Sequence, residues 1–470
     1  MTQFTMTIDG SAVATEYAFD VVNPATAHSF AQAPDCTPQQ LDAAMAAAAR
    51  AFPAWSRDEK LRRTALRDAA DALEAAGDRL ARLITREQGK PLALSRDEIL
   101  ASAAWLRYYA DLEIPRERIQ DDTDGYAEVV SRPLGVVAAL APWNFPLVLA
   151  VWKIAPALLA GNSMVLKPSP YTPLATLLMG ELLRPVLPAG VLNVISGRDP
   201  LGALMTEHST PRKISFTGSS ATGRKVAVAA AADLKRVTLE LGGNDPAIVL
   251  EDADPAAYAA SIVDSAFTNS GQVCFAVKRL YVPRRRHDEW VDALAARAAE
   301  LGVGDGLDDG VRMGPVSNRL QLDRVRALVT DACAHGAVAA FGGTEPDRAG
   351  YFYTPTVLAH AADGSRVVDE EQFGPVLPVI PYRDPGDAVA AANASDYGLT
   401  ASVWSPDTDR AAETAWSLEC GQVSLNAHGT GLRPDLPFGG HKSSGIGVEN
   451  GIWGLREYSQ LQVLTGPPRR

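Results

Sequence analysis

The sequence predicts an α/β protein with a doubly wound parallel sheet, a second α/β domain and a small β-ribbon. Three observations predict this class. From about residue 133 short apolar runs alternate with helix-like segments, and a second alternating block runs from Glu240 to about residue 426. Residues 115–132 and the C-terminal stretch 458–464 have the character of extended strands instead. Alternation of strands and helices implies parallel sheets buried on both faces, as in a doubly wound, Rossmann-like domain.

Length and composition fit this class. The chain has 470 residues, of which 47% are hydrophobic and 21% are charged. A chain of this length is expected to form about three structural units. We therefore expect two large domains and a small appendage, with almost all of the chain folded.

The charge and the cysteines narrow the range of partners. The net charge is −12 and there is no basic stripe to neutralise phosphates, so neither nucleic acid nor an anionic membrane is an expected partner. The N-terminus lacks the features of a signal peptide, and no run approaches the ~18 apolar residues of a spanning helix. Four scattered cysteines without CxxC pairing, and the absence of HExxH spacing, predict a reducing, cytoplasmic location and no metal site.

A helix-rich segment precedes the alternating blocks. Thr37 supplies an N-cap, and Pro38 occupies the first position of an Ala-rich helix. Two further helices are expected over about 58–88 and 92–112, separated by the Gly-Lys-Pro tripeptide at 89–91.

The strand candidates are short apolar runs between helix-like stretches. In the first block they are 135–140, 163–166, 191–195 and 213–216, and in the second block they are 247–250, 280–282 and 376–380. Helices of the first block are expected near 147–160, 173–187, 199–207 and 220–232. The two ribbon segments need a partner surface, because isolated ribbons are only marginally stable.

Cys274 is the candidate nucleophile. It ends the sequence Gly271-Gln272-Val273-Cys274. A thiol that attacks an electrophilic carbon must be ionised or deprotonated on demand, where a substrate can reach it. Gly271 allows the backbone to turn sharply and to approach a substrate closely. A lone cysteine is more often a buried structural residue, so the residue type alone leaves both interpretations open.

Two further polar residues are candidates for the same chemistry. Glu240 precedes Leu-Gly-Gly and lies 34 residues before Cys274 (274 − 240); it could serve as a base, although a Glu at a strand end is also an ordinary structural feature. Asn144 is bracketed by two prolines in the segment 142–146, and its amide can donate a hydrogen bond to a developing alkoxide. An asparagine in a turn is the alternative.

A candidate phosphate-binding turn follows one of the strands. Residues 216–224, Phe-Thr-Gly-Ser-Ser-Ala-Thr-Gly-Arg, follow a strand and open a helix. Backbone N–H groups at a helix N-terminus can hold a pyrophosphate. A plain strand-to-helix turn is the alternative, because the segment does not form a GxGxxG motif.

These motifs, in this order and with Pro-Phe-Gly-Gly at 437–440, resemble those of the aldehyde dehydrogenase superfamily, and the resemblance runs from about Val21 to Gln462. It implies a homodimer or a homotetramer. It also implies a three-part fold: residues 1–114 and 133–239 form the NAD(P)-binding domain, 240–426 the catalytic domain, 115–132 and 455–470 the oligomerisation arm, and 427–454 the substrate and anchor loop region.

The resemblance implies oxidation of a small-molecule aldehyde to a carboxylic acid with NAD(P)+. The Cys274 thiolate would add to the aldehyde carbon to form a thiohemiacetal, with Asn144 and the Cys274 backbone N–H holding the oxyanion. Transfer of hydride to the nicotinamide would leave a thioester, and Glu240 would activate the water that hydrolyses it. Lys153 is implied to support a proton relay near the site.

Three alternatives stay open at this point. In a CoA-acylating semialdehyde dehydrogenase, CoA would take the acyl group, although Glu240 disfavours this because it is water activation that needs a base. A non-catalytic binding or structural protein could keep the same fold. A cysteine hydrolase would use the thiol but would not need the cofactor segments.

The implied cofactor is NAD, with NADP as the alternative. Lys167 is implied to bond the adenine ribose, and Pro170 stands where many relatives carry a Glu that would repel a 2′-phosphate. Glu371 and Phe373 match the segment that holds the nicotinamide ribose and ring. The other residues implied to bind the cofactor are Pro142, Trp143, Ser169, Gly218, Ser219, Gly223 and Leu241.

The implied substrate pocket is aromatic. Phe438 should face the substrate, and Phe145 and Trp152 are expected to join it in a funnel for an apolar aldehyde, although each could equally be a core residue. The candidates for polar substrate contacts are Gln272, His428 and Arg433.

Overall fold

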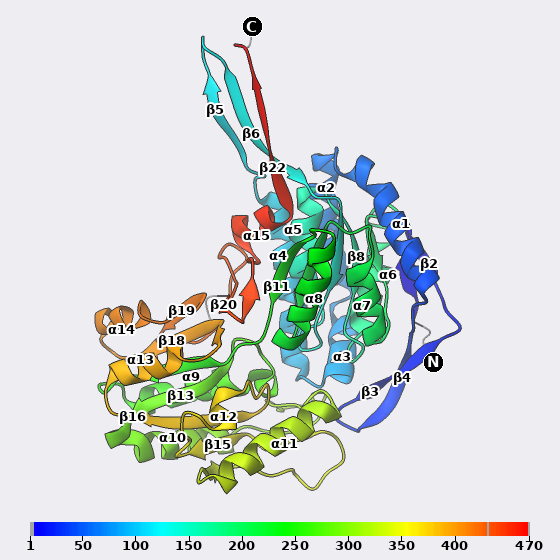
Figure 1. The fold of residues 1–470 in the computed structure, drawn as a ribbon. Coiled ribbons are helices and arrows are strands. Elements are labelled where there is room, and N and C mark those ends of the chain that lie inside the picture. The colour runs from blue at the N-terminus through cyan, green and yellow to red at the C-terminus, as the bar shows by residue number, and fades with distance from the viewer. Residues whose placement is uncertain (1–3, 430–431, 469–470) are drawn as a thin grey trace.

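The computed structural model describes residues 4–429 and 432–468, and it has two lobes, each built on one large β-sheet, with a ribbon projecting from the first lobe (Figure 1). The strands of the first sheet are, in spatial order, β2 (Ser11–Val13), β1 (Met6–Ile8), β9 (Leu192–Val194), β8 (Ser163–Lys167), β7 (Val136–Leu140), β10 (Lys213–Thr217), β11 (Arg236–Glu240) and β21 (Gly445–Ile446). The five inner strands, from β9 to β11, run parallel, and both flanks are antiparallel.

The chain order of the inner strands reverses direction at the centre of this sheet. From β7 the chain moves outward through β8 to β9, then returns to β10 on the other side of β7 and continues to β11. In a doubly wound sheet a crevice opens at such a switch point, outside the carboxyl ends of the two central strands. The segments that follow β7 and β10 therefore meet at one place.

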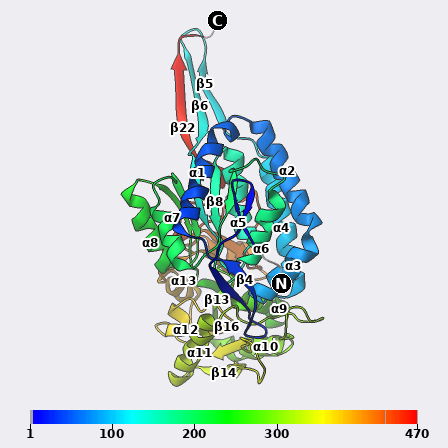
Figure 2. The same ribbon diagram turned by 90° about the vertical axis from the view of Figure 1, so that its right-hand side faces the viewer.

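Helices cover both faces of the first sheet (Figure 2). One face carries α1 (Pro38–Trp55), α7 (Asp199–Glu207) and α8 (Ser220–Ala232), and the other carries α5 (Val148–Ala160) and α6 (Leu174–Leu183). Outside α5 and α6 lies a further layer formed by α2 (Glu59–Ala75), α3 (Gly77–Gln88) and α4 (Leu92–Asp111). Every residue of α5 is buried, because the helix lies between the sheet and this outer layer.

The second lobe contains a seven-stranded sheet. Its spatial order is β14 (Val338–Phe341), β15 (Thr356–Ala359), β16 (Val376–Tyr382), β13 (Val277–Pro283), β12 (Asp245–Val249), β18 (Thr400–Trp404) and β19 (Gln422–Leu425). All pairs are parallel except β14 with β15. The helices of this lobe are α9 (Pro255–Phe267), α10 (His287–Ala299), α11 (Arg319–Ala334), α12 (Arg366–Asp369), α13 (Pro385–Asn393) and α14 (Thr408–Ala415). The α/β class with parallel sheets is confirmed.

Three antiparallel strands form the projecting ribbon (Figure 1). They are β5 (Arg116–Asp121), β6 (Tyr126–Pro133) and β22 (Ser459–Gly466), and β22 pairs with β6 along its whole length. The two segments that were expected to need a partner surface therefore pair with each other.

The smaller elements connect these units. They are the hairpin of β3 (Ala18–Asn23) and β4 (His28–Pro34), the pair of β17 (Tyr397–Gly398) and β20 (His441–Lys442), the helix α15 (Gly451–Glu457), and two short 3-10 turns at Thr268–Gly271 and Arg284–Arg286. In the described ranges no helix is long and apolar enough to cross a membrane.

The N-terminal helices agree with the sequence in one respect and differ in another. Thr37 caps α1 through a capping box, in which its hydroxyl accepts the Gln40 N–H at 3.2 Å and the Gln40 amide accepts the Thr37 N–H at 3.0 Å. The single helix expected over 58–88 was wrong. It is broken into α2 and α3, because the chain leaves helical geometry at Ala76, just before Gly77.

Candidate active site

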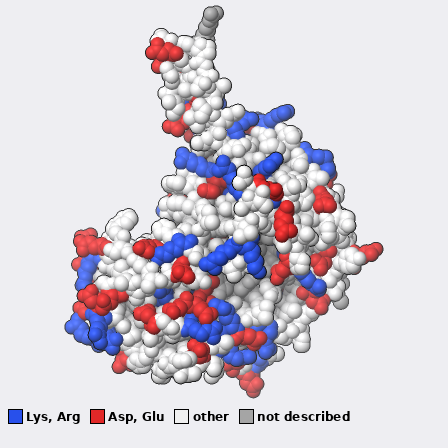
Figure 3. Space-filling model, in the orientation of Figure 1, with Lys and Arg blue, Asp and Glu red and all other residues white. Residues whose placement is uncertain are grey.

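A pocket of about 950 Å³ lies at the switch point of the first sheet and extends to the second lobe. The segments after β7 and β10 supply Trp143, Asn144 and Gly218, and the second lobe supplies Cys274 and Glu371. Figure 3 shows Lys, Arg, Asp and Glu mixed over the outer surface around the hollow between the lobes. The candidate nucleophile and the candidate cofactor segments thus share one opening.

The turn before Cys274 is unusually tight. Asn269, Ser270 and Gly271 all have positive φ, at 51°, 58° and 69°. A Cβ on Gly271 would lie 2.1 Å from the carbonyl oxygen of Gly374, so only glycine fits there. The turn holds Cys274 partly exposed at the pocket wall. Burial, with Asp245 and Glu371 nearby, raises the pKa of the thiol, so the resting thiol is protonated.

Glu240 ends β11 and is buried beneath the pocket. Neither of its carboxylate oxygens has a hydrogen-bond partner among the described residues. Burial and the negative charge of Glu449 raise its pKa well above the ordinary value, and Lys153 opposes this. An unpartnered carboxylate with a raised pKa has the properties of a general base.

Lys153 and Glu449 form a buried ion pair next to Glu240. Lys153 lies in the apolar helix α5, and its Nζ donates to Glu449 Oε1 at 2.6 Å and to Thr217 Oγ1 at 2.6 Å. Both side chains are at most 1% exposed. Glu449 was not predicted. A lysine in an apolar helix needs a buried counter-ion, so Lys153 indicates that a carboxylate partner exists but not that the partner is Glu449.

Asn144 lies beside the turn that carries Cys274. Its side-chain Nδ2 donates to the backbone carbonyl oxygen of Gln272 at 3.0 Å. The amide therefore contacts the chain two residues before Cys274. The backbone carbonyl oxygen of Asn144 accepts hydrogen bonds from Lys90 Nζ at 2.7 Å and from Asn269 Nδ2 at 3.1 Å. Neither of these two donors was predicted.

The two glycines after Glu240 are needed for the crossing between the lobes. A Cβ on Gly242 would lie 2.5 Å from Glu371 Oε2, and one on Gly243 would lie 2.4 Å from the Cys274 carbonyl oxygen. The Gly243 N–H donates to Glu371 Oε1 at 3.0 Å. Burial raises the pKa of Glu371. The chain from Glu240 therefore passes directly between Glu371 and Cys274.

The residues of the pocket fit a dinucleotide. The first turn of α8 lines it, with Ser219 as the N-cap whose hydroxyl accepts the Thr222 N–H at 3.3 Å. A Cβ on Gly218 would lie 2.5 Å from the Phe216 ring, so glycine at 218 lets the turn pack against that ring. A helix N-terminus with close backbone approach is suited to a pyrophosphate. The other expected cofactor residues on the pocket wall are Pro142, Trp143, Lys167, Ser169, Pro170, Leu241, Glu371 and Phe373.

Gly223 was expected to bind the cofactor, but the structure places it differently. It does not line the pocket but lies inside α8, where a Cβ would be 2.4 Å from Leu241 Cδ2. Its small size lets α8 pack closely on Leu241, which itself lines the pocket.

Lys167 and Phe373 both line the pocket. Burial lowers the pKa of Lys167 to about 8, partly offset by Asp199 and Asp35. The Phe373 ring meets the Trp143 ring edge to face, with 5.2 Å between centroids. The pocket wall thus offers both an amine and aromatic surface.

The aromatic side chains form a cluster behind Cys274. Trp152 packs on Phe438 with 5.4 Å between ring centroids, and Phe438 on Phe275 with 6.0 Å. Trp152 and Phe438 are buried, whereas Phe145 and Phe275 are partly exposed. Phe275 was not among the expected substrate residues.

The three expected polar contacts are not placed at the pocket. Gln272 is fully buried, because its amide bonds the backbone of Asn269 and Ser317. The His428 ring is buried against the hydroxyls of Ser402 and Thr400, and burial lowers its pKa to about 4. Their polarity is used inside the second lobe.

Arg433 is the third of these residues. Its guanidinium is exposed and pairs with Asp435 at 2.5 Å. Burial of Gln272 and His428 contradicts their expected role as substrate contacts, since a sequence does not show which way a polar side chain points, whereas the role of Arg433 stays a prediction.

Comparison with known proteins agrees with this geometry. The aldehyde dehydrogenase family model matches residues 12–464. Phenylacetaldehyde dehydrogenase of Pseudomonas fluorescens is 41% identical, over 95% of this chain and 92% of its own length. The NADP-dependent succinate-semialdehyde dehydrogenase of Escherichia coli is 38% identical, over 95% and 94%. The structure of betaine aldehyde dehydrogenase from Staphylococcus aureus in complex with NAD+ superposes with a TM-score of 0.95 at 34% identity, covering 99% of this chain and 95% of that one.

The chain belongs to the aldehyde dehydrogenase family. It is an NAD(P)-dependent enzyme that oxidises an aldehyde to a carboxylic acid. The resemblance seen in the sequence is confirmed, and nothing in the comparisons favours the CoA-acylating alternative.

Proposed function

We propose that Cys274 is the nucleophile of this reaction. The observation that carries the proposal is its position at the wall of the pocket that also holds the cofactor residues, next to the Asn144 amide. Because the resting thiol is protonated, it must lose its proton as it attacks the aldehyde carbon.

The oxyanion that forms on the substrate is held by two donors. These are the Asn144 amide and the backbone N–H of Cys274. Donors of this kind stabilise the charge that develops in the transition state, and loss of one typically slows a reaction by about 10²–10³-fold. When bound, NAD(P)+ supplies the hydride acceptor.

Glu240 is the base for the second half of the reaction. It removes a proton from the water that attacks the thioester, and the charges of the Lys153–Glu449 pair act on its pKa in opposite directions. A base for water supports hydrolysis as the fate of the acyl group.

For the cofactor we propose NAD ahead of NADP. Lys167 shares its surroundings with the carboxylates of Asp199 and Asp35, which would repel a 2′-phosphate. Pro170 provides no carboxylate for the ribose hydroxyls, so the preference rests on Asp199. An ion contact in water is worth about 1 kcal/mol, a factor of about 5. We expect kcat/KM to be higher with NAD than with NADP. Asp199→Asn should lower the ratio of the two kcat/KM values by a factor of about 5. If the variant leaves this ratio unchanged, Asp199 does not determine the preference.

For the substrate we propose a medium-sized apolar or aromatic aldehyde. Phe145, next to Asn144, and Phe275, next to Cys274, are partly exposed, and Arg433, a candidate for a polar substrate contact, is paired with Asp435 on the surface. Measurement of kcat/KM for aliphatic, aromatic and acidic aldehydes tests this, and a preference for succinate semialdehyde would contradict it.

We also propose a homodimer or homotetramer that assembles through the ribbon, in the cytoplasm. The ribbon exposes Leu461, Val463 and Leu464. All four cysteines are free thiols, which suits a reducing compartment.

A further inference from the structure

Lys90 and Glu98 form an ion pair in the interior of the first lobe, and neither side chain lines the pocket that holds Cys274. Lys90 lies in the connection from α3 to α4, and Glu98 lies in α4. Their side chains are 0% exposed, and Lys90 Nζ lies 2.7 Å from Glu98 Oε2. Isolating two charges in this way is expensive unless geometry and further hydrogen bonds compensate for it. Here the ammonium group and the carboxylate each make further hydrogen bonds to one neighbouring loop.

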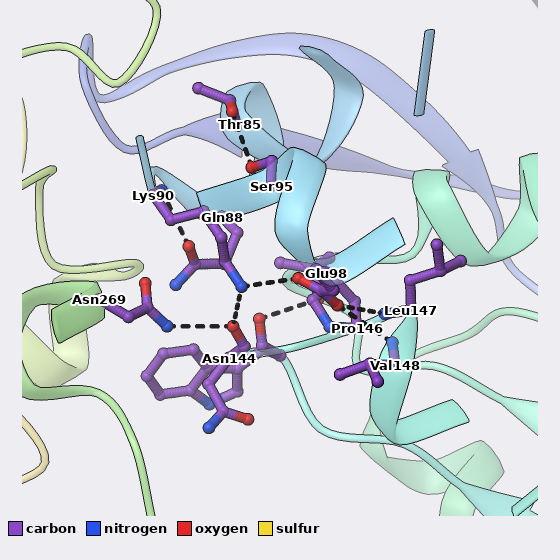
Figure 4. A network of polar contacts seen from close by, with 12 residues as sticks. Thr85, Gln88, Lys90, Ser95, Glu98, Asn144, Pro146, Leu147, Val148 and Asn269 are labelled. Carbon is purple, nitrogen blue, oxygen red and sulfur yellow. Dashed lines mark hydrogen bonds and ion pairs between the residues drawn. The ribbon is translucent and has the colours of Figure 1, made fainter. Parts of the chain in front are cut away.

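That loop is the segment 144–148, which carries the oxyanion donor (Figure 4). Lys90 Nζ donates to the Asn144 carbonyl oxygen at 2.7 Å and lies 3.6 Å from the centre of the Phe145 ring. Glu98 Oε1 accepts the N–H groups of Leu147 at 2.8 Å and Val148 at 3.1 Å. The ion pair therefore holds both ends of the loop, with its cation at Asn144 and its anion at the start of α5.

The Asn144 backbone and the connection that carries Lys90 also contact the second lobe. Asn269, in the tight turn before Cys274, also donates to the Asn144 carbonyl oxygen. The Leu92 N–H donates to the Gly306 carbonyl oxygen at 2.9 Å, and a Cβ on Gly306 would lie 2.4 Å from the Lys90 carbonyl oxygen. The connection that carries Lys90 thus fits closely against the lobe that carries the nucleophile.

We infer that Lys90 and Glu98 are positioning residues that hold the Asn144 amide at the oxyanion site. They act through the backbone of the 144–148 loop and do not touch the substrate. The inference rests on the proposed role of Asn144. Displacement of a reacting group by about 1 Å can slow a reaction about 10²-fold, so loss of the pair should slow the first half of the reaction strongly.

The test compares Lys90→Met with the wild type in rapid mixing. The full-length enzyme with saturating NAD+ is mixed with phenylacetaldehyde, hexanal or succinate semialdehyde, and the aldehyde with the largest wild-type NADH burst is used. We expect the burst rate constant to fall about 10- to 100-fold, with the Kd for NAD+ within about 2-fold of the wild type. A burst as fast as the wild type, in a folded variant, would overturn the inference.

The hydrolysis of p-nitrophenyl acetate without cofactor provides a second readout. The ester also needs the oxyanion donors when the thiol attacks it, so Lys90→Met should slow its acylation as well. Slowing with the aldehyde alone would mean that Lys90 places the cofactor and not Asn144, which would also overturn the inference.

A double-mutant cycle separates this inference from the role of Asn144. Asn144→Ala should slow the burst about 10²–10³-fold. If Lys90 acts through Asn144, Lys90→Met should add nothing in the Asn144→Ala background. If Asn144→Ala has no effect, the oxyanion assignment fails; if it has the expected effect and the two losses multiply, only the positioning role fails.

Glu87→Gln is the matched control. Glu87 is as deeply buried as Glu98 and caps the start of α6 in the same way, by accepting the N–H groups of Leu174 and Ala175 at 2.7 and 2.9 Å. It should lower the melting temperature without slowing the burst. If Lys90→Met does not fold, Glu98→Gln carries the test, because it keeps an oxygen for Leu147 and Val148 but removes the charge that holds Lys90. A normal burst in Glu98→Gln would then count against the inference.

Discussion

At the scale of single residues, burial governs the charges around Cys274. Burial disfavours ionised groups, so it raises the pKa of the thiol, of Glu240 and of Glu371, and it lowers the pKa of Lys278 to about 8. Lys278 Nζ donates to the Gly271 carbonyl oxygen, on the turn before Cys274. The acids near the pocket are therefore biased toward their neutral forms until the reaction needs a charge.

Replacement of Glu240 tests this at one residue. Glu240→Gln should still give a burst of NADH but should turn over slowly, because the thioester forms and its hydrolysis lacks a base. A general base works only when ionised. Since the pKa of Glu240 is raised, the wild-type hydrolysis rate should increase with pH through and above the usual Glu range, and this increase should disappear in Glu240→Gln.

Steady-state rates and stopped-flow bursts across pH measure both effects. Cys274→Ala is the control and should give neither burst nor turnover. If the steady-state turnover of Glu240→Gln equals that of the wild type, Glu240 is not the general base for hydrolysis.

At the scale of elements, the tight turn before Cys274 determines where the thiol lies. Its three consecutive positive φ values bring the chain to Gly374 of the second lobe, and Gly271 is the residue that allows the contact. The expectation that Gly271 permits a sharp turn agrees with this geometry. The sequence did not show that the turn packs on Gly374.

Gly271→Ala should therefore destabilise the enzyme and displace Cys274. A left-handed conformation costs about 1–2 kcal/mol for a residue with a Cβ, and overpacking typically adds about 1–3 kcal/mol. Gly336→Ala is the matched control, because Gly336 has φ +100° but nothing within 4 Å of a Cβ. We expect urea denaturation to show the larger loss for Gly271→Ala and a reduced NADH burst for that variant alone. Equal losses for the two variants would contradict the steric argument.

At the scale of the whole molecule, the ribbon is the feature that the single chain leaves uncovered. Its strand β22 is exposed along most of its length, and Leu461, Val463 and Leu464 are 73%, 61% and 55% exposed. Neighbouring apolar side chains on one projecting ribbon are typical of a surface that another chain covers.

The double variant Leu461→Lys/Val463→Lys should therefore dissociate the assembly. Burial of two lysines at an interface between chains is unfavourable without partners, so size-exclusion chromatography with light scattering should show a smaller species. Leu320→Lys is the control, because Leu320 is 71% exposed on α11, away from the ribbon. A wild-type chain that elutes as a monomer would contradict the proposed assembly itself.

The sequence by itself determined the α/β class, four of the five inner strands of the first sheet (β7, β8, β9 and β10) and the segments that carry Cys274, Glu240 and Asn144. Strand periodicity, caps such as Thr37, and glycine or proline at turns are local properties, so they can be read without the fold. The strands β11, β14, β15, β18 and β19 were not predicted, because their short runs lack a distinctive local pattern.

Only the tertiary structure decided which side chains meet. Lys153 and Glu449 are 296 positions apart in the chain, and Lys90 is 54 positions from Asn144. No local pattern specifies such pairs, since a buried charge shows that it needs a partner but not which residue it is. For the same reason His428 and Gln272 are buried inside the second lobe, while Lys90 and Glu98, which no motif indicated, bond the loop that contains Asn144.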